Sequence, residues 1–294
     1  MTRSLGFLAA LLLTACGGGA VGDVVLRASG GMEASQGILA SQTADGWVVE
    51  FDHAVIRVED FSLRTANGDD ANVAFDPLVV ELVPETSLID EIRAVPAQRW
   101  DRTSYLLSPV EAGDRVVGVE DRIVTLMRDE GWSSYYEGRL VAPTGTVDEN
   151  GDPVTVIPFA FGFPVVASYA FCVNGLDRTD GVVVPVSSAV DVELTWHLTH
   201  LFFDSFVELS ALRVEPQAAR WDGATELTLP DLDVPLGGLR AIDGGPLIDD
   251  QGNPVFYIPG PSGADTLEEF VLAGRPGHFN GLEGFCMTEV TVLE

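Results

Sequence analysis

The chain has 294 residues, no lysine, 16 arginines and 45 aspartates and glutamates, and its formal net charge is −29. Phosphate binding needs a basic surface, so this composition argues against nucleic acid as a partner. Hydrophobic residues make up 46% of the chain, which is ordinary for a globular domain, and the length suits one large or two small domains. The acidic excess therefore does not imply disorder.

The N-terminus has the order of a bacterial export signal. In MTRSLGFLAALLLTAC, Arg3 precedes an apolar run at residues 5–13, and small residues then lead directly to Cys16. This segment resembles the lipobox of bacterial lipoproteins. The resemblance implies a signal peptide at residues 1–15, acylation of Cys16, and a lipidated, glycine-rich tether at residues 16–22. The alternatives are an ordinary signal peptide or a short membrane helix, although the apolar run is too short to span a bilayer. We expect an extracytoplasmic protein of the bacterial cell envelope, held to a membrane by lipid.

Residues 23–294 predict a mainly β fold, an antiparallel β-sandwich with a few short helices. Runs of β-branched or alternating residues indicate strands at 47–58, 79–83, 115–119, 182–186, 190–196 and 288–292. The uncharged stretch 154–173 is interrupted by Pro158 and Pro164, which favours buried strands with a bend over a membrane helix. Helices are predicted at residues 87–93, 197–209 and 265–272.

Two pairs of segments are similar and keep their order along the chain. Residues 147–158 are similar to 248–259, and residues 92–101 are similar to 212–222. The pairs favour a duplicated β unit with a split near residues 175–185. The alternative is that turns of similar geometry select similar residues. In the second pair, Trp100 and Trp221 each stand between Arg and Asp. A tryptophan so placed could bind sugar or peptide, but in a sandwich it is more often part of the core.

The segment VPAQRWDRTSY at residues 95–105 resembles a recurrent strand of exported bacterial β-sandwich lipoproteins. In those proteins a Pro-Ala-Gly turn leads to an aromatic residue and then to an apolar strand. The copper-binding lipoproteins associated with methanobactin operons are one such group. Here Gln98 and Arg99 stand in place of the usual glycine. The resemblance implies a sandwich and does not by itself establish copper binding.

Two cysteines, Cys172 and Cys286, remain after Cys16. A pair of cysteines in an exported protein predicts a disulfide, because the compartment is oxidising. The alternatives are two buried free thiols or a thiolate metal site.

The chain has only four histidines, and His197 and His200 form an H-x-x-H pair. If the strand that ends at Trp196 turns helical, these two rings and Asp204 fall on one face. In an extended chain the two rings would point to opposite faces. Two imidazoles and a carboxylate are suitable ligands for zinc or copper. The alternative is a pair of interfacial histidines bonded to the backbone.

His53 is expected to approach this site from a strand as a third nitrogen ligand, or to be a single polar residue at the end of the sheet. His278 precedes Cys286 in a predicted loop, and we expect it to be exposed to solvent. Calcium is the competing metal. The oxygen-rich turns at residues 148–152 and 249–253 could bind it, but neither matches an EF-hand loop.

The sequence contains no G-x-S-x-G, H-E-x-x-H, P-loop or dinucleotide-binding pattern. An enzyme is therefore not indicated, and a metallohydrolase is the third hypothesis. The first hypothesis is a membrane-anchored lipoprotein that binds zinc or copper for delivery or capture, with an envelope protein as candidate partner. The second is a β-sandwich module that binds a protein or a glycan without metal.

Overall fold

The computed structural model describes residues 19–294 except 72, 74, 84–86, 208–210, 224, 275–276, 280–283 and 294. The predicted signal peptide and Cys16 therefore lie outside the described residues. No helix in these ranges has both the length and the apolar character that a bilayer span requires.

Strands account for most of the regular structure. They are β1 (Val21–Ser29), β2 (Val48–Arg64), β3 (Leu78–Glu81), β4 (Ser87–Pro96), β5 (Arg99–Trp100), β6 (Arg102–Leu107), β7 (Arg115–Val117), β8 (Ser134–Val141), β9 (Val156–Phe163), β10 (Val165–Val173), β11 (Val182–Val183), β12 (Ala189–Trp196), β13 (Leu227–Thr228), β14 (Gly277–Phe279) and β15 (Phe285–Val292). The α-helices are α1 (Gly31–Gln36), α2 (Asp121–Asp129), α3 (Glu215–Ala218) and α4 (Leu267–Leu272). The 3-10 helices are η1 (Leu198–Phe202), η2 (Leu229–Leu232), η3 (Leu236–Gly238) and η4 (Gly260–Ser262).

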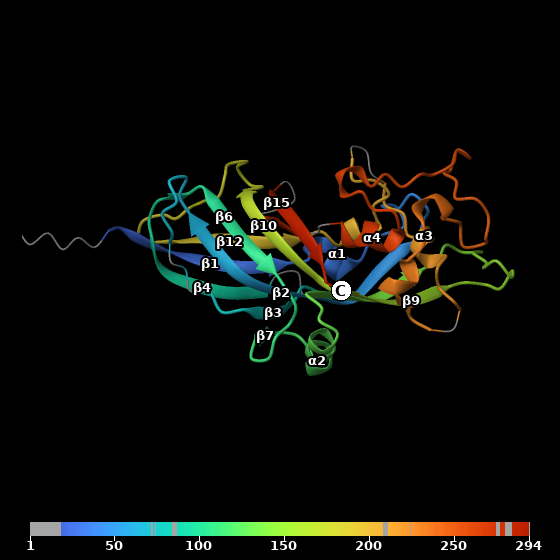
Figure 1. Cartoon of the computed structure of the whole chain (residues 1–294), viewed down its shortest axis with the longest axis horizontal. Coiled ribbons are helices and arrows are strands. Elements are labelled where there is room, and N and C mark those ends of the chain that lie inside the picture. The colour runs from blue at the N-terminus through green and yellow to red at the C-terminus, as the bar shows by residue number, and fades with distance from the viewer. Residues whose placement is uncertain are drawn as a thin grey trace, which may run out of the picture.

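The strands form a small sheet, a large sheet and a two-stranded sheet of β5 and β11. The four-stranded sheet has the order β14-β12-β1-β4. The nine-stranded sheet has the order β13-β9-β8-β2-β6-β10-β15, and in addition β3 pairs with β2 and β7 pairs with β3. Figure 1 shows β6, β10 and β15 of the large sheet in front of β12 and β1 of the small one, with α3 and α4 gathered at one end of the molecule. The prediction of a mainly β, sandwich-like fold is confirmed.

Most strand pairs are antiparallel, as predicted, but three pairs are parallel. Strand β1 pairs in parallel with β12, β3 with β7, and β13 with β9. Strands β1 and β12 are far apart in the sequence, and most of the strands between them belong to the large sheet. A hairpin turn therefore does not impose an antiparallel direction on this pair.

Aromatic side chains from both sheets meet in the core. The rings of Tyr105 on β6 and Tyr169 on β10 stack with their centroids 4.6 Å apart. The indole of Trp196, at the end of β12, lies 5.8 Å and 6.2 Å from these two rings. All three side chains are buried, so the end of β12 is fixed against the large sheet.

The region predicted as a helix at residues 87–93 is strand β4. Its buried residues Ile89, Ile92 and Val95 are spaced three apart, which imitates a helical period. The pairing of β4 with β1 shifts register twice. Each shift adds an extra residue on β4, and this breaks the alternation that a regular strand would show.

The other helix predictions had mixed outcomes. Strand β12 does end in a helical turn, but the helix predicted at residues 197–209 is reduced to η1. The helix predicted at 265–272 is present as α4, which begins with a capping box between Thr266 and Glu269. The uncharged stretch forms β9 and β10 with Pro164 between them, as expected.

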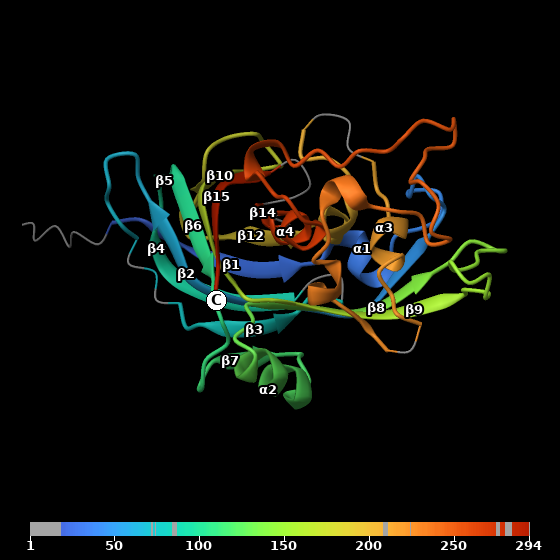
Figure 2. The same cartoon turned by 45° about the vertical axis from the view of Figure 1, so that its right-hand side comes forward.

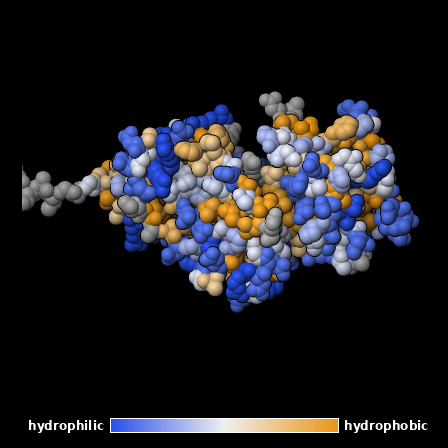
Figure 3. Space-filling model, in the orientation of Figure 1, coloured by the Kyte–Doolittle hydropathy of each residue, from blue (hydrophilic) through white to orange (hydrophobic). Residues whose placement is uncertain are grey.

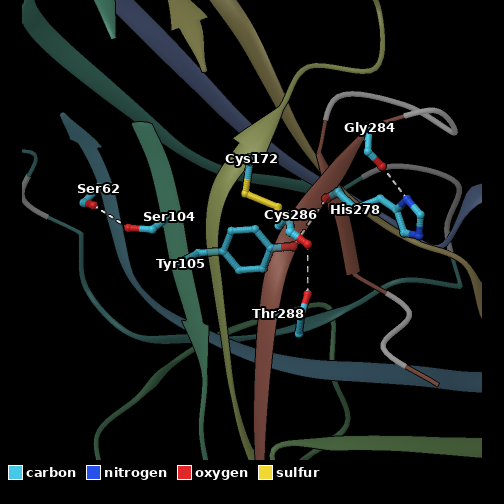
Figure 4. Close-up of a disulfide and its surroundings, with 8 residues drawn as sticks. All are labelled: Ser62, Ser104, Tyr105, Cys172, His278, Gly284, Cys286 and Thr288. Carbon is cyan, nitrogen blue, oxygen red and sulfur yellow. Dashed lines mark hydrogen bonds between the residues drawn. A yellow bond between two sulfur atoms is a disulfide. The ribbon is translucent and has the colours of Figure 1, made fainter. Parts of the chain in front are cut away.

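The predicted disulfide is confirmed. Cys172 on β10 and Cys286 on β15 are joined across 114 residues of sequence. These strands are adjacent in the large sheet, so the bond ties the last strand to the body of the domain (Figure 4).

Strand β15 is an edge strand, and several of its apolar side chains are exposed. Phe285, Met287 and Val292 are all exposed. Figure 3 shows apolar surface across the middle of this view, where β15 runs, between more hydrophilic ends.

Of the two pairs of similar segments, one pair has the same conformation and the other does not. Residues 147–153 and 248–254 form hairpin turns closed by equivalent bridges, Val147 with Pro153 and Ile248 with Pro254. In contrast, residues 92–101 belong mostly to strands β4 and β5, whereas 212–222 include helix α3. Duplication of a β unit stays a prediction.

Candidate metal site

Three of the four histidines lie together where β12 ends. The ring centroids are 4.3 Å apart for His197 and His278, 5.1 Å for His200 and His278, and 5.6 Å for His197 and His200. We call these three residues the histidine cluster.

Strand pairing brings the rings of His197 and His278 together. In the antiparallel pair of β12 and β14, Thr195 is opposite His278 and Trp196 is opposite Gly277. Opposite residues share a face, and His197 follows Thr195 by two positions. His197 is therefore the diagonal neighbour of His278 on that face.

A tight helical turn adds the third ring. His197 precedes η1, and the backbone N–H of His200 donates to the carbonyl of His197 at 3.0 Å. Side chains three residues apart eclipse each other in a 3-10 helix. This places the ring of His200 over that of His197, with the two planes only 24° apart.

Backbone carbonyls orient two of the rings. Nδ1 of His200 is 2.9 Å from the carbonyl oxygen of Gly274, which follows α4. Nδ1 of His278 is hydrogen-bonded to the carbonyl oxygen of Gly284 (Figure 4). A neutral ring that donates from Nδ1 has its lone pair on Nε2, which is the arrangement found in many histidines that bind metal.

The surroundings disfavour protonation of His197 and His278. Burial, and to a smaller extent the neighbouring rings of His278 and His200, lowers the pKa of His197 to about 3. Burial also lowers the pKa of His278, against the opposing effect of its bond to Gly284. Nε2 of His197 is buried and has no hydrogen-bond partner among the described residues. An unprotonated, unpartnered nitrogen costs free energy in the folded state unless a ligand satisfies it.

The donor set suits a borderline transition metal. Imidazole nitrogens bind zinc and copper well, and three imidazoles on one tetrahedral ion have ring centres about 5 Å apart. However, no group of three or more His, Cys, Asp or Glu side chains in the described part of the chain is already arranged to hold an ion. Binding by the cluster therefore requires that at least one ring rotate.

The structure places Asp204 elsewhere. Its carboxylate accepts a hydrogen bond from Nε of Arg213 at 2.9 Å and another from the backbone N–H of Ala211 at 2.8 Å. The helix expected to carry Asp204 ends at Phe202, so the spacing of seven residues no longer brings this side chain to the face of His197. Arg213 therefore pairs with the Asp204 carboxylate that was expected to bind a metal ion.

His53 belongs to a different network. Its Nδ1 is 2.8 Å from Oε2 of Glu81, and its Nε2 is 4.0 Å from Oε1 of Glu120. Glu81 also accepts the backbone N–H of Ala54 at 2.9 Å. His53 therefore joins β2 to β3 and the start of α2, and it is not part of the histidine cluster.

His278 is the member that the sequence did not identify. It was expected in an exposed loop, but it lies half-buried in β14. Its position depends on pairing between segments about 80 residues apart, and the three residues of β14 carry no strand pattern of their own. The preceding Gly277 lies so close to β10 that a Cβ there would be 2.6 Å from the ring of Tyr169, a contact that the sequence alone does not reveal.

An apolar pocket adjoins the cluster. It has a volume of about 370 Å³, and His200 lies in its lining with Phe203, Phe206 and Pro259. The ring of Phe203 is 4.6 Å from that of His200. The pocket thus gives the cluster a side that a small ligand can reach.

The oxygen-rich turns are explained by their own hydrogen bonds. Oδ1 of Asp148 accepts the backbone N–H groups of Asn150 and Asp152, both at 2.8 Å. Asp249 accepts those of Gln251 and Asn253 at 2.9 Å and 2.7 Å. These are Asx turns, which need no calcium ion to hold them.

Comparisons with known proteins add little. No family model and no curated protein matches this chain. One solved structure, MbnP from Methylosinus trichosporium, is similar over 61% of this chain and 76% of its own, with 12% sequence identity and a TM-score of 0.32. A likeness this low assigns neither fold nor function.

Proposed function

We propose that this chain binds a transition-metal ion, zinc or copper, through His197, His200 and His278. The observation that carries the proposal is the convergence of three imidazoles around a buried nitrogen with no partner. Burial lowers the pKa of His197 and of His278, so both nitrogens stay unprotonated at neutral pH, as ligation requires.

The site suits delivery or capture of the ion better than a structural role. Three protein nitrogens leave a coordination position open, whereas structural zinc sites are closed by four protein ligands. The apolar pocket beside His200 provides access to that position. The fold does not need the metal to bring the rings together, since strand pairing and η1 already do so.

The proposal includes the cellular location of the protein. The lipobox-like segment ending at Cys16 implies a lipid anchor on the outer side of a bacterial membrane. Metal capture there would act on ions outside the cytoplasm, and a partner in the envelope would receive or supply them.

Calorimetry with zinc and with copper tests the site. We expect one equivalent of one of these ions to bind the parent protein and not the variant His197→Ala/His200→Ala. His278→Ala should weaken binding by at least about tenfold, the lower end of what losing even a supporting group costs a metal site.

Two control variants separate the structure-based ligand set from the sequence-based one. His53→Ala removes a histidine that is bonded to Glu81, and Asp204→Asn alters a group that is paired with Arg213. Both should bind the ion like the parent. Equal binding by the parent and the double histidine variant would refute the site. A loss in His53→Ala that matches the loss in His278→Ala would refute this choice of ligands.

A further inference from the structure

A second pocket lies near the tips of two hairpins, apart from the histidine cluster. It has a volume of about 500 Å³, and its lining includes Trp221, Arg220, Arg240, Asp148, Asn150 and Asp222. We call it the polar pocket. Its volume lies within the range of small-ligand sites, which is about 300–1,000 Å³.

Trp221 is held so that it offers its ring and not its N–H. It follows α3, and its indole packs partly against the core. Its Nε1 donates to the carbonyl oxygen of Thr225, while the carboxylate of Asp222 accepts the backbone N–H of Thr225 at 3.1 Å. The indole N–H is therefore used within the protein, and the ring is the part that a ligand in the pocket can contact.

The sides of the polar pocket are joined to one another. The hairpin of residues 240–246 is closed by a bridge between Arg240 and Pro246. It is tied to α3 by a hydrogen bond from the N–H of Ile242 to Glu215 at 3.3 Å. It also approaches the hairpin of residues 147–153 closely, since a Cβ on Gly244 would lie 3.3 Å from Cβ of Glu149. The pocket is therefore built into the fold.

The lining offers hydrogen-bond donors and acceptors in the same small space. Neither Arg220 nor Arg240 forms an ion pair with any described residue, although acidic residues far outnumber arginines in this chain. Backbone hydrogen bonds lower the pKa of Asp148, so its carboxylate remains an acceptor. The side-chain amide of Asn150 supplies both kinds of group.

The other Arg-Trp-Asp segment shows what the motif does without a pocket. Trp100 is 1% exposed, and its Nε1 donates to the carbonyl oxygen of Pro96 at 3.1 Å. Arg99 pairs with Asp101 of the same segment at 3.0 Å. Trp100 is therefore part of the core, whereas Trp221 and Arg220 line a cavity.

We propose that the polar pocket binds a neutral saccharide, with a pyranose ring stacked on Trp221. Each sugar hydroxyl is both a donor and an acceptor, so it pairs with guanidinium and carboxylate groups alike. The CH groups on one side of the ring give an apolar surface that matches an aromatic face. The lining carries two guanidinium groups and three carboxylates, those of Asp148, Glu149 and Asp222, so both signs of charge are available to polar hydroxyls.

Titration of tryptophan fluorescence and calorimetry with neutral cello-, xylo-, malto- and chito-oligosaccharides test this inference. At least one of them should bind at millimolar concentration or below. Trp221→Ala should weaken that binding by about tenfold, the order expected for loss of one aromatic stacking contact. Trp221→Phe should retain part of it.

Variants of exposed residues guard against a misfolded Trp221→Ala protein. Arg220→Ala/Arg240→Ala should also weaken binding without loss of fold. Phe171→Ala and Arg102→Ala alter an exposed aromatic residue and its cation–π partner outside the pocket, and they should bind like the parent. His197→Ala/His200→Ala should bind saccharide normally, because the two sites have no lining residue in common.

Two outcomes would overturn the proposal. In one, no saccharide binds in a way that depends on Trp221. In the other, a lysine-rich peptide binds in a way that depends on Trp221 while the saccharides do not, which would assign the pocket to a cationic segment of a protein.

Discussion

Burial makes His197 unfavourable to protonate, and this links the histidine cluster to stability. Its side chain has little exposure, and its pKa falls to about 3, chiefly by desolvation. In the unfolded chain the same ring titrates near its ordinary pKa of about 6.5. Between these two values the unfolded state binds a proton that the folded state does not bind.

The sign of the resulting pH dependence follows from this difference. The contribution of His197 to stability is complete above about pH 6.5 and is lost as the pH falls toward about 3. The slope is at most about 1.4 kcal/mol per pH unit for one group. We therefore expect the metal-free protein to lose stability relative to His197→Gln over this window, measured by urea unfolding with chelator at several pH values. A difference between the two proteins that stays constant from pH 7 to pH 4 would contradict the assignment.

The residues of the site were only partly predictable. The H-x-x-H spacing identified His197 and His200 because a helical turn is a local feature, and the alternating strand before it showed where the turn begins. His278 was missed because strand pairing decides its place. Asp204 was included because the helix was assumed to continue, and His53 because a strand face alone does not show which partner it meets.

At the scale of elements, β14 and β15 hold the cluster together. Strand β14 has only three residues and carries His278. Next to it, Gly284 precedes β15 and orients that ring through its carbonyl oxygen. The hydroxyl of Tyr105 donates to the backbone carbonyl of His278 at 3.3 Å (Figure 4). The disulfide at Cys286 thus stands two residues from the group that fixes His278.

We expect loss of the disulfide to affect both stability and metal binding. Cys172→Ala/Cys286→Ala should lower the free energy of unfolding by about 2–5 kcal/mol, because a long loop of the unfolded chain is released. Metal affinity should also fall, since β15 no longer holds Gly284 firmly. Denaturant titration and calorimetry check the two effects, and reductant should change the parent but not the variant. Unchanged metal affinity in a destabilised variant would show that β15 does not support the cluster.

At the scale of the whole molecule, strand content was easier to predict than strand direction. Alternating and β-branched runs located several strands of both sheets, β2, β12 and β15 among them, because they reflect which faces are buried. They did not identify β1 or β8. The parallel pairing of β1 with β12 has no local signature. Strand β4 was mistaken for a helix because its register shifts change the spacing of its buried residues.

The start of the domain was also hard to predict from the sequence. Residues 16–22 were expected to form a tether, yet β1 already starts at Val21. Gly22 is part of that strand, where a Cβ would lie 2.0 Å from the carbonyl oxygen of Pro185. A glycine that permits close backbone contact looks the same in the sequence as one that permits flexibility.

The parallel pairing also sets the direction in which the proposed site would face. Asp23 is beside Ala189 and Ser29 is beside Thr195, so β1 and β12 run side by side from the N-terminal end toward the histidine cluster. Figure 2 shows β1 running toward the end of the molecule where α1 and α3 lie. A strand rises about 3.3 Å per residue, so the nine residues of β1 place the cluster roughly 30 Å from the start of the domain.

Anchoring and metal binding should therefore be separable. Cys16→Ser offers no thiol for acylation, and each buried CH2 of a lipid chain contributes about 0.8 kcal/mol to membrane attachment. We expect the variant to move from the detergent phase to the aqueous phase in a phase-separation assay, while its zinc or copper affinity equals that of the parent. If both proteins remain in the detergent phase, Cys16 is not the anchor. If the soluble variant loses metal binding, the site depends on the membrane, contrary to its place at the far end of β1.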